Sequence, residues 1–203
     1  MSFLAKSALL IALALPVAAH AATLTPVKSG ATVAGDTNNI VPTTGSSLPS
    51  NNPAYASNST TGATDPASQW VWIRKGQTYP TSATYTFTFD LTGYDPLTAV
   101  LSGVWGVDNN GTVSLNNNVI AQLTGSSTLN FSQLHTYGTD KDSFFLAGLN
   151  TLTFHLFDTG APAAFRATAK VVAEASPVPV PAGGILLVSA LLAGAAARRR
   201  KAA

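Results

Sequence analysis

The sequence predicts an all-β protein, an antiparallel β-sandwich or jelly roll, and three observations support that prediction. The first is the stretch TYTFTFDL (residues 84–91), in which a large apolar residue occupies every second position. The second is a series of further short apolar runs separated by turns rich in Asn, Asp and Gly. The third is that no stretch of the central region repeats its apolar residues with the 3.6-residue period of a helix.

The first element along the chain is an export signal in residues 1–21. Met1–Lys6 carries a single positive charge, Ser7–Ala18 is apolar, and Ala19-His20-Ala21 fits the small-x-small pattern of signal peptidase sites. We expect cleavage after Ala21 or Ala22. The alternative is a retained N-terminal anchor, which the short apolar run does not favour.

Residues 22–67 are rich in Ser, Thr, Asn, Gly and Pro and contain few large apolar residues. One interpretation is a flexible arm. The other is an irregular first part of the domain, in which loops and one short strand lie over the sheets. We favour the second, because Ile40, Val41 and Tyr55 are available to anchor the segment.

The β-sandwich domain is expected over residues 68–175, and its clearest strand is the one around TYTFTFDL. Side chains of a strand point alternately to opposite faces. We therefore expect one buried face and one outer face: Tyr85, Phe87, Phe89 and Leu91 inside, and Thr84, Thr86, Thr88 and Asp90 outside.

The other strands of this domain are bounded by turn residues. The expected strands are Ala99–Val107, Thr112–Leu115, Val119–Leu123, Thr151–Phe157 and Phe165–Val172. The expected turns are Gly93–Pro96, Asp108–Gly111, Asn116–Asn118 and Asp158–Gly160. Asn and Gly accept the positive φ of tight turns, so GTVSLNNNVIAQL is predicted to be a hairpin with Asn116–Asn118 at its tip.

The last element, residues 176–203, has three parts. Val178-Pro179-Val180-Pro181-Ala182 comes first, followed by the uncharged stretch Gly183–Ala197 and the basic residues Arg198, Arg199, Arg200 and Lys201. Proline disfavours helix in its own and the preceding residue, so the first part should be extended. The second part is expected to be a transmembrane helix, although its apolar stretch is only marginally long enough to cross the hydrocarbon core. The basic residues should stay cytoplasmic, which leaves the domain outside.

This three-part order resembles the VPLPA-type PEP-CTERM sorting signals, with Val180 where that motif usually has Leu. The resemblance implies that the partner is an exosortase-type membrane peptidase of Gram-negative bacteria. It also implies transient anchoring in the inner membrane, followed by delivery to the cell surface or exterior and association with exopolysaccharide. The alternative is a plain C-terminal anchor that is not processed.

The central region is similar to domains common in exported PEP-CTERM-type proteins, in the segments TYTFTFDLTG, LSGVWGVDNNGTVSLNN and FFLAGLNTLTFHLFD. Their pattern also resembles galactose-binding-like jelly rolls, over about Trp70–Val172. Such folds include carbohydrate-binding modules and many structural domains. The resemblance therefore implies a fold and does not by itself imply a function.

Composition excludes several classes of function. Of the 11 basic residues, five lie in the two terminal segments, so the middle has six against nine acidic residues and a formal charge of −3. A basic nucleic-acid-binding surface is therefore not expected. The chain has no cysteine, which excludes disulfides, a thiol nucleophile and cysteine zinc sites.

Three tryptophans are candidates for stacking on a sugar ring. Trp70 and Trp72 share one face of the segment WVWIRK, so at a sheet edge they would form an exposed ligand platform. The alternative is that both pack in the core. Trp105 lies within an apolar run and is expected to be a core residue.

No obligate cofactor is expected, and a structural calcium ion is the one candidate. Asp108, Asn109 and Asn110 bring oxygen atoms close together in sequence, as do Asp140 and Asp142. Calcium prefers several oxygen ligands from flexible loops. Asn-rich turns also occur for backbone reasons alone, so the second interpretation is a turn without an ion.

Catalysis is not expected. His135 and His155 are the histidines left after signal removal, and alternation with Phe154 and Leu156 should point His155 outward. No Gly-x-Ser-x-Gly motif supports a Ser–His–Asp triad. The acidic residues lie in or beside turns, apart from Asp90 at a strand end, rather than paired across a cleft.

Together these features predict an exported, non-catalytic β-sandwich of the cell surface or exopolysaccharide matrix. One function is carbohydrate or matrix binding. The alternatives are a purely structural surface protein with an unprocessed anchor, and a glycan-active enzyme.

Overall fold

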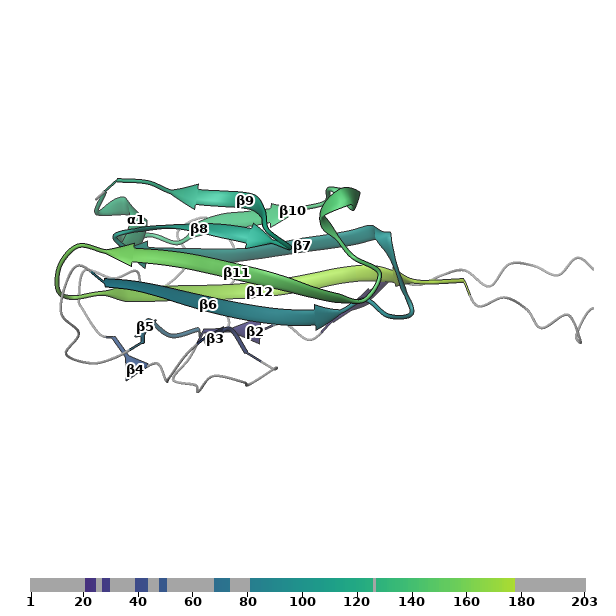
Figure 1. Cartoon of the computed structure of the whole chain (residues 1–203), viewed down its shortest axis with the longest axis horizontal. Coiled ribbons are helices and arrows are strands. Elements are labelled where there is room, and N and C mark those ends of the chain that lie inside the picture. Colours follow the sequence, from purple (N-terminus) through teal and green to yellow (C-terminus); the bar gives the residue numbers. More distant parts are fainter. Residues whose placement is uncertain are drawn as a thin grey trace, which may run out of the picture. The chain divides into compact units, whose positions relative to one another are not determined.

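Two antiparallel sheets, packed face to face, make up the part of the chain that the structure describes (Figure 1). The structure is a computed structural model, and it describes residues 21–24, 27–29, 39–43, 48–50, 68–73, 81–125 and 127–177. Its elements are β1 (Ala21–Thr23), β2 (Val27–Lys28), β3 (Val41–Pro42), β4 (Leu48–Pro49), β5 (Val71–Trp72), β6 (Thr81–Asp90), β7 (Tyr94–Asp108), β8 (Asn110–Leu115), β9 (Asn118–Leu123), α1 (Leu129–Ser132), β10 (His135–Thr139), η1 (Asp142–Phe144), β11 (Leu149–Asp158) and β12 (Ala164–Ala175).

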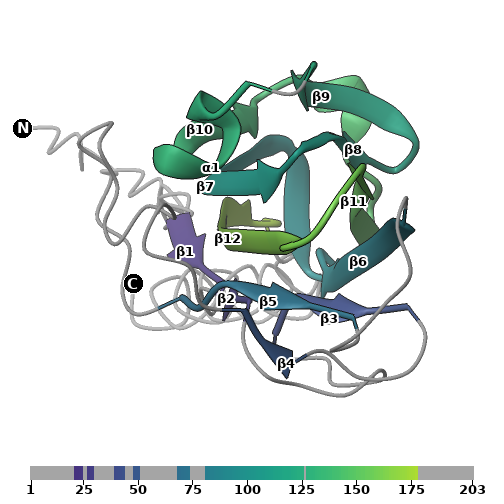
Figure 2. The same ribbon diagram turned by 90° about the vertical axis from the view of Figure 1, so that its left-hand side faces the viewer.

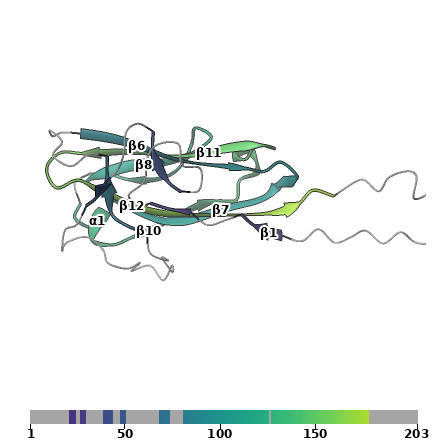
Figure 3. The same ribbon diagram turned by 90° about the horizontal axis from the view of Figure 1, so that it is seen from below.

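The long strands are divided between the two sheets. Sheet I has the order β10-β7-β12-β5-β4, and β1 and β2 also pair with β12. Sheet II has the order β3-β6-β11-β8-β9. Figures 2 and 3 show the two layers from the end and from below. The predicted all-β, antiparallel fold class is therefore confirmed for the described residues.

An aromatic core fills the space between the sheets. Phe154 lies at its centre, with ring centroids 4.9 Å from Phe165, 5.7 Å from Tyr137 and 6.2 Å from Trp105. Trp105 is 1% exposed, so its expected place in the core is confirmed. Aromatic pairs at these separations add to the free energy of burial.

Strand β6 confirms the predicted alternation. Its inward residues are all buried: Tyr85, Phe87, Phe89 and, just beyond the strand, Leu91. The alternating Thr residues are half-buried on the outer face, and Asp90 is exposed. Asp90 accepts hydrogen bonds from the backbone N–H and the hydroxyl of Thr92, and these two bonds hold its pKa below the ordinary value.

The turns match the sequence only in part. The β8–β9 hairpin turns at Asn116 and Asn117, whose φ angles are 48° and 68°, as the Asn-rich tip predicted. The predicted turn at Gly93–Pro96 is wrong in extent, because β7 already begins at Tyr94, which pairs with Ala175. The predicted turn at Asp108–Gly111 is also shorter than expected, because β7 ends at Asp108 and β8 begins at Asn110. This connection carries the chain from β7 in sheet I to β8 in sheet II.

The described residues between 21 and 50 contribute short strands to both sheets. β1 and β2 pair with β12, β4 pairs with β5, and β3 pairs with β6. Ile40 is fully buried and Val41 is 6% exposed. Apolar burial at these two positions holds this part of the chain against the sandwich.

Most of both predicted targeting segments falls outside the described residues, as does Tyr55. This applies to the signal residues 1–20, the motif residues 178–182, the apolar stretch and the four basic residues near the C-terminus. Neither helix in the described part of the chain has the length and hydropathy to cross a bilayer.

Candidate functional site

The two tryptophans expected as an exposed platform are buried. Trp70 is 8% exposed and packs in a small apolar cluster with Val104, Leu134 and Ala164. Trp72 is 4% exposed and belongs to the main core. A ring that stacks on a sugar must have a free face, so the platform interpretation is corrected to the alternative of core packing.

The burial of Trp70 has a local cause on strand β7. A Cβ atom at Gly106 would lie 2.8 Å from Cη2 of Trp70, so the indole rests directly on the backbone of that glycine. Leu134 and the partly buried Phe131 close the cluster. The sequence WVWIRK does not reveal this neighbour, which lies more than thirty residues further along the chain.

The first calcium candidate, Asp108–Asn110, includes a side chain that already has hydrogen bonds to the protein. Asn109 donates through Nδ2 to Oδ1 of Asp108 (2.6 Å). Its Oδ1 accepts from the backbone N–H (2.8 Å) and the hydroxyl (2.7 Å) of Thr159. Asn109 thus ties the β7–β8 connection to the β11–β12 connection, the structural role that Asn has in turns.

The second candidate consists of Asp140, which precedes η1, and Asp142, the first residue of η1; both are exposed. Lys141 between them places Nζ 5.2 Å from the centre of the Phe144 ring. Within the described residues no three His, Asp or Glu side chains come together as a metal-binding group.

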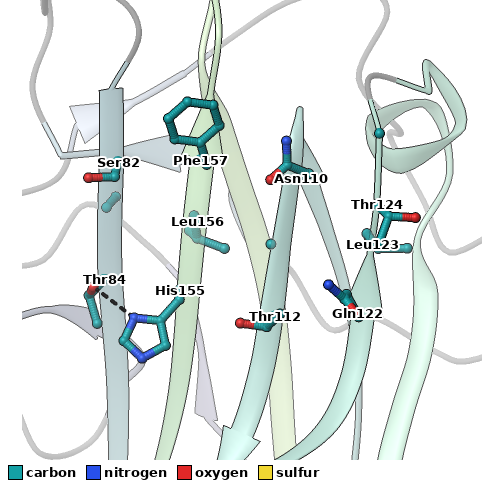
Figure 4. Close-up of a pocket in the computed structure, with 13 residues that line it drawn as sticks. Ser82, Thr84, Asn110, Thr112, Gln122, Leu123, Thr124, His155, Leu156 and Phe157 are labelled. Atoms are coloured by element: carbon teal, nitrogen blue, oxygen red, sulfur yellow. Dashed lines mark hydrogen bonds between the residues drawn. The ribbon is translucent and has the colours of Figure 1, made fainter.

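A shallow groove of about 450 Å³ lies on the outer face of sheet II, over β6, β11, β8 and β9. Strand pairing arranges its side chains in two rows that run across the strands (Figure 4). One row is Ser82, Phe157 and Asn110; the other is Thr84, His155, Thr112 and Gln122. Neighbouring strands lie about 4.8 Å apart, so each row spans roughly 10–15 Å, the scale of a short oligosaccharide.

Phe157 gives the groove its aromatic surface. Its side chain is 40% exposed, although every inward neighbour on β11 is buried. The alternation of β11 causes this exposure: Leu152, Phe154 and Leu156 face the core, so Phe157 must face outward. Ser82 and Asn110 pair with it from the two adjacent strands, so hydrogen-bonding groups lie on both sides of the ring.

His155 occupies the corresponding place in the second row and is exposed, as predicted. Its Nδ1 lies 3.3 Å from Oγ1 of Thr84, and Thr112 flanks it on the other side. The ring is therefore oriented by a hydroxyl while Nε2 remains directed away from that contact. Hydroxyl and amide groups of this kind both donate and accept hydrogen bonds.

The backbone beneath these rows depends on Gly111. A Cβ atom there would lie 2.7 Å from the carbonyl oxygen of His155, so only glycine lets β8 approach β11 so closely. The described lining residues include no Asp, Glu, Lys or Arg. The polar side chains that line the groove are accordingly hydroxyls, amides and the imidazole of His155.

Next to Phe157, at the end of β11, a carboxyl group is buried. Asp158 is fully buried; its Oδ2 accepts from the N–H of Gly160 (3.2 Å), and its Oδ1 has no hydrogen-bond partner among the residues that the structure describes. Loss of hydration and the nearby negative charge of Asp108 raise the pKa of Asp158 to about 6. Asp158 is not among the residues that line the groove.

Sequence reasoning placed His155 outward but did not select Phe157, Asn110 or Gln122 as site residues. One available signal was the alternation Leu-Thr-Phe-His-Leu-Phe, residues 152–157, which puts a large aromatic on the polar face. The assembly of four strands into one surface could not be inferred from that stretch. The motif Val178–Ala182 and the basic residues Arg198–Lys201 lie outside the described residues.

The chain was compared with protein families, curated proteins and solved structures. No protein-family model matches the chain, and no curated protein matches it. Among solved structures, a family 35 carbohydrate binding module from an environmental isolate is similar, with 16% sequence identity and a TM-score of 0.32. The match covers 66% of this chain and 98% of that one.

Proposed function

We propose that this chain is an exported, non-catalytic surface protein whose sandwich domain binds an uncharged polysaccharide in the groove of sheet II. The observation that carries the proposal is the half-exposed ring of Phe157 between hydroxyl and amide side chains. A pyranose has an apolar C–H face and a rim of hydroxyl groups. An aromatic surface with uncharged hydrogen-bonding groups on either side complements both features.

The lining favours binding over hydrolysis. A glycosidase of the usual kind needs two carboxyl groups on opposite sides of the scissile bond. The described lining offers no carboxylate, while its hydroxyl, amide and imidazole groups can each hydrogen-bond a sugar. The absence of Lys and Arg from that lining favours a neutral polysaccharide over one rich in uronic acids.

The binding proposal is tested with the exported protein and a panel of neutral and acidic polysaccharides, by affinity electrophoresis. Phe157→Ala should lower the affinity for a neutral polysaccharide by about tenfold or more, because an aromatic anchor is removed. Val119→Ala, which removes an exposed side chain of β9 outside the groove, is the matched control and should bind as the parent does. Equal affinities of the two variants would refute the groove as the site.

The same proposal includes delivery by the C-terminal segment. The segment Gly183–Ala197 would hold the chain in the inner membrane, with Arg198–Lys201 in the cytoplasm, while an exosortase-type peptidase cuts near Pro181 and Ala182. The released domain would then join the cell surface or the exopolysaccharide matrix. The proline-containing motif and the order of the three parts support this proposal.

Intact-mass analysis of the exported protein from its native host tests the processing. We expect loss of the signal and of roughly the last 22 residues. Replacing Pro179 and Pro181 with Ala should allow helix to extend into the motif and retain the protein in the membrane fraction. Exterior protein that still carries Arg198–Lys201 would mean that the tail is only an anchor.

A further inference from the structure

Three exposed leucines lie in the segments at the end of the domain where β12 finishes. The side chains of Leu97 and Leu149 are each 65% exposed and that of Leu146 is 53% exposed. Leu97 is near the start of β7, Leu146 lies in the loop between η1 and β11, and Leu149 is the first residue of β11. Exposed leucines are unremarkable singly, but several at one end of a small domain indicate a contact surface.

Strand pairing places these segments at the same end. Ala175, the last residue of β12, pairs with Tyr94 at the start of β7. Leu149 pairs with Asp90 at the end of β6, and the N–H of Leu91 donates to the carbonyl of Gly148 at 2.9 Å. The loop after β6, the loop before β11 and the end of β12 therefore meet there, at the right of the domain in Figure 1. We call this surface the leucine end.

The chain leaves the domain at the leucine end, and only a short segment connects the domain to the uncharged apolar stretch. Five residues separate Pro177, the last described residue, from Gly183, the first residue of the uncharged apolar stretch. Fully extended, five residues span at most about 18 Å. The polar headgroup layer of one leaflet is roughly 5–8 Å thick. If the apolar stretch enters a bilayer, the end of β12 must stay close to the lipid surface.

We propose that the leucine end is a lipid-contacting surface, which rests on the headgroup region of the bilayer while the C-terminal segment is anchored there. The inference rests on the proposed membrane insertion of that segment. Leu97, Leu146 and Leu149 would each transfer exposed apolar surface into the interface. The domain would then stand on the membrane with its long axis upright, and the groove of sheet II would remain open to the exterior.

Because of the charges at the leucine end, this contact depends on the tether, that is, on the anchored C-terminal segment. Four acidic residues are exposed at or beside it, and Lys141 is its basic residue in the described part of the chain. The acidic residues are Asp90, Asp140, Asp142 and Glu174. Such a surface has no attraction for anionic lipid, so contact depends on apolar burial and on the high local concentration that the anchored segment imposes. Cleavage of the tail would remove the tether and release the domain from the membrane.

The test uses the full chain, which contains no cysteine and can therefore carry single fluorescent labels. Leu97→Cys, Leu146→Cys and Leu149→Cys are each labelled with an environment-sensitive dye and reconstituted in phosphatidylcholine vesicles with or without quencher-bearing lipid. Leu129→Cys is the control: it is 55% exposed and lies in α1, which Asn130 attaches to Asn109 at the opposite end of β7. All four positions are exposed, so each variant should fold.

We expect lipid-borne quencher to remove most of the fluorescence at 97, 146 and 149 and to leave the label at 129 bright. Chains that float with the vesicles but show no quenching at the three positions would overturn the inference and leave the anchoring proposal intact. Equal quenching at all four positions would overturn it too, because the domain would then lie on its side. Chains that do not float would refute the anchoring and, with it, the inference.

Discussion

The outer faces of the two sheets differ, although the strands beneath them follow the same alternation. On sheet I the outer face is covered near the end of β7: Val104 of β7 and Ala164 of β12 pack with Trp70 and Leu134 in a second apolar cluster, whereas Val100 and Ser102 earlier on β7 are exposed. On sheet II the outer face of β6, β11 and β8 is open, and its side chains are mostly hydroxyls, with His155 and Phe157 among them.

That difference explains why the largest aromatic candidates were not the exposed ones. Gly106 has no side chain, so the ring of Trp70 packs directly on its backbone and is removed from water. Phe157 has no such cover because its strand neighbours across the sheet are Ser82 and Asn110. Burial thus covers part of one outer face and leaves the other open.

The inner and outer sides of sheet II should differ most in their effect on stability. Phe87→Ala removes a ring that is 5% exposed and should lower the free energy of unfolding by about 3–5 kcal/mol, through lost burial and a cavity. Thr86→Ala, its outward neighbour, should change it by less than about 0.5 kcal/mol. Urea denaturation measures both, and similar losses at the two positions would show that the face assignment of β6 is wrong.

The two outer faces themselves are compared by Trp70→Ala and Phe157→Ala. Trp70→Ala should lower the free energy of unfolding by about 3 kcal/mol, because it exposes Val104 and leaves a cavity above Gly106. The second should cost less than about 1 kcal/mol, since the ring is 40% exposed, yet it should weaken polysaccharide binding. If Phe157→Ala proved as destabilising as Trp70→Ala, the ring would be a packing residue and sheet II would lose its candidate site.

Much of the fold was predictable because it depends on local alternation. The stretch TYTFTFDL assigned both faces of β6 correctly, and the Asn-rich tip located the β8–β9 hairpin. The segment around Asp108 was harder, since the same turn residues serve a hairpin and a crossing between sheets. Only the pairing of β8 with β11, about forty residues later, distinguishes the two.

The candidate site was less predictable because it is assembled from four strands. Residues 82–84, 110–112, 122 and 155–157 meet only when β11 pairs with both β6 and β8, and β8 pairs with β9. The outward direction of His155 followed from its own strand, but its neighbour Thr84 did not. For Trp70 the sequence left two interpretations, and long-range packing on Gly106 decided between them.

Asp158 is the last residue of β11 and is buried, so its ionisation should affect the stability of the fold. Its pKa is about 6 in the folded protein and 3.8 ordinarily, so the folded state binds the proton more tightly. The resulting stability is fully present below about pH 4 and is lost as the pH rises through 6. Asp158→Asn keeps an acceptor for Gly160 and should raise the free energy of unfolding at pH 7 by up to about 3 kcal/mol.

At pH 4 the same variant should match the parent, and thermal unfolding across the two pH values measures the difference. Asp90→Asn is the control of opposite sign. The pKa of Asp90 is lowered by its hydrogen bonds from Thr92, so its contribution is present at pH 7 and is lost as the pH falls through that lowered pKa. A gain in stability at pH 7 from Asp90→Asn, or none from Asp158→Asn, would contradict the conclusion that burial disfavours the ionised form of Asp158.

The smallest expected effect on stability is that of Thr84→Ala, on the open face of sheet II. Thr84 is half-buried and its hydroxyl lies 3.3 Å from Nδ1 of His155, so the unfolding free energy should change by less than about 0.5 kcal/mol. Binding should weaken more than stability, by roughly fivefold, because the imidazole loses the hydroxyl that orients it and must be ordered by the ligand. Thr84→Ser restores the hydroxyl and should restore the affinity. A serine variant as weak as the alanine variant would show that the hydroxyl does not position His155. Stability loss above about 1 kcal/mol from Thr84→Ala would show that the open face, like the covered one, serves to hold the fold together.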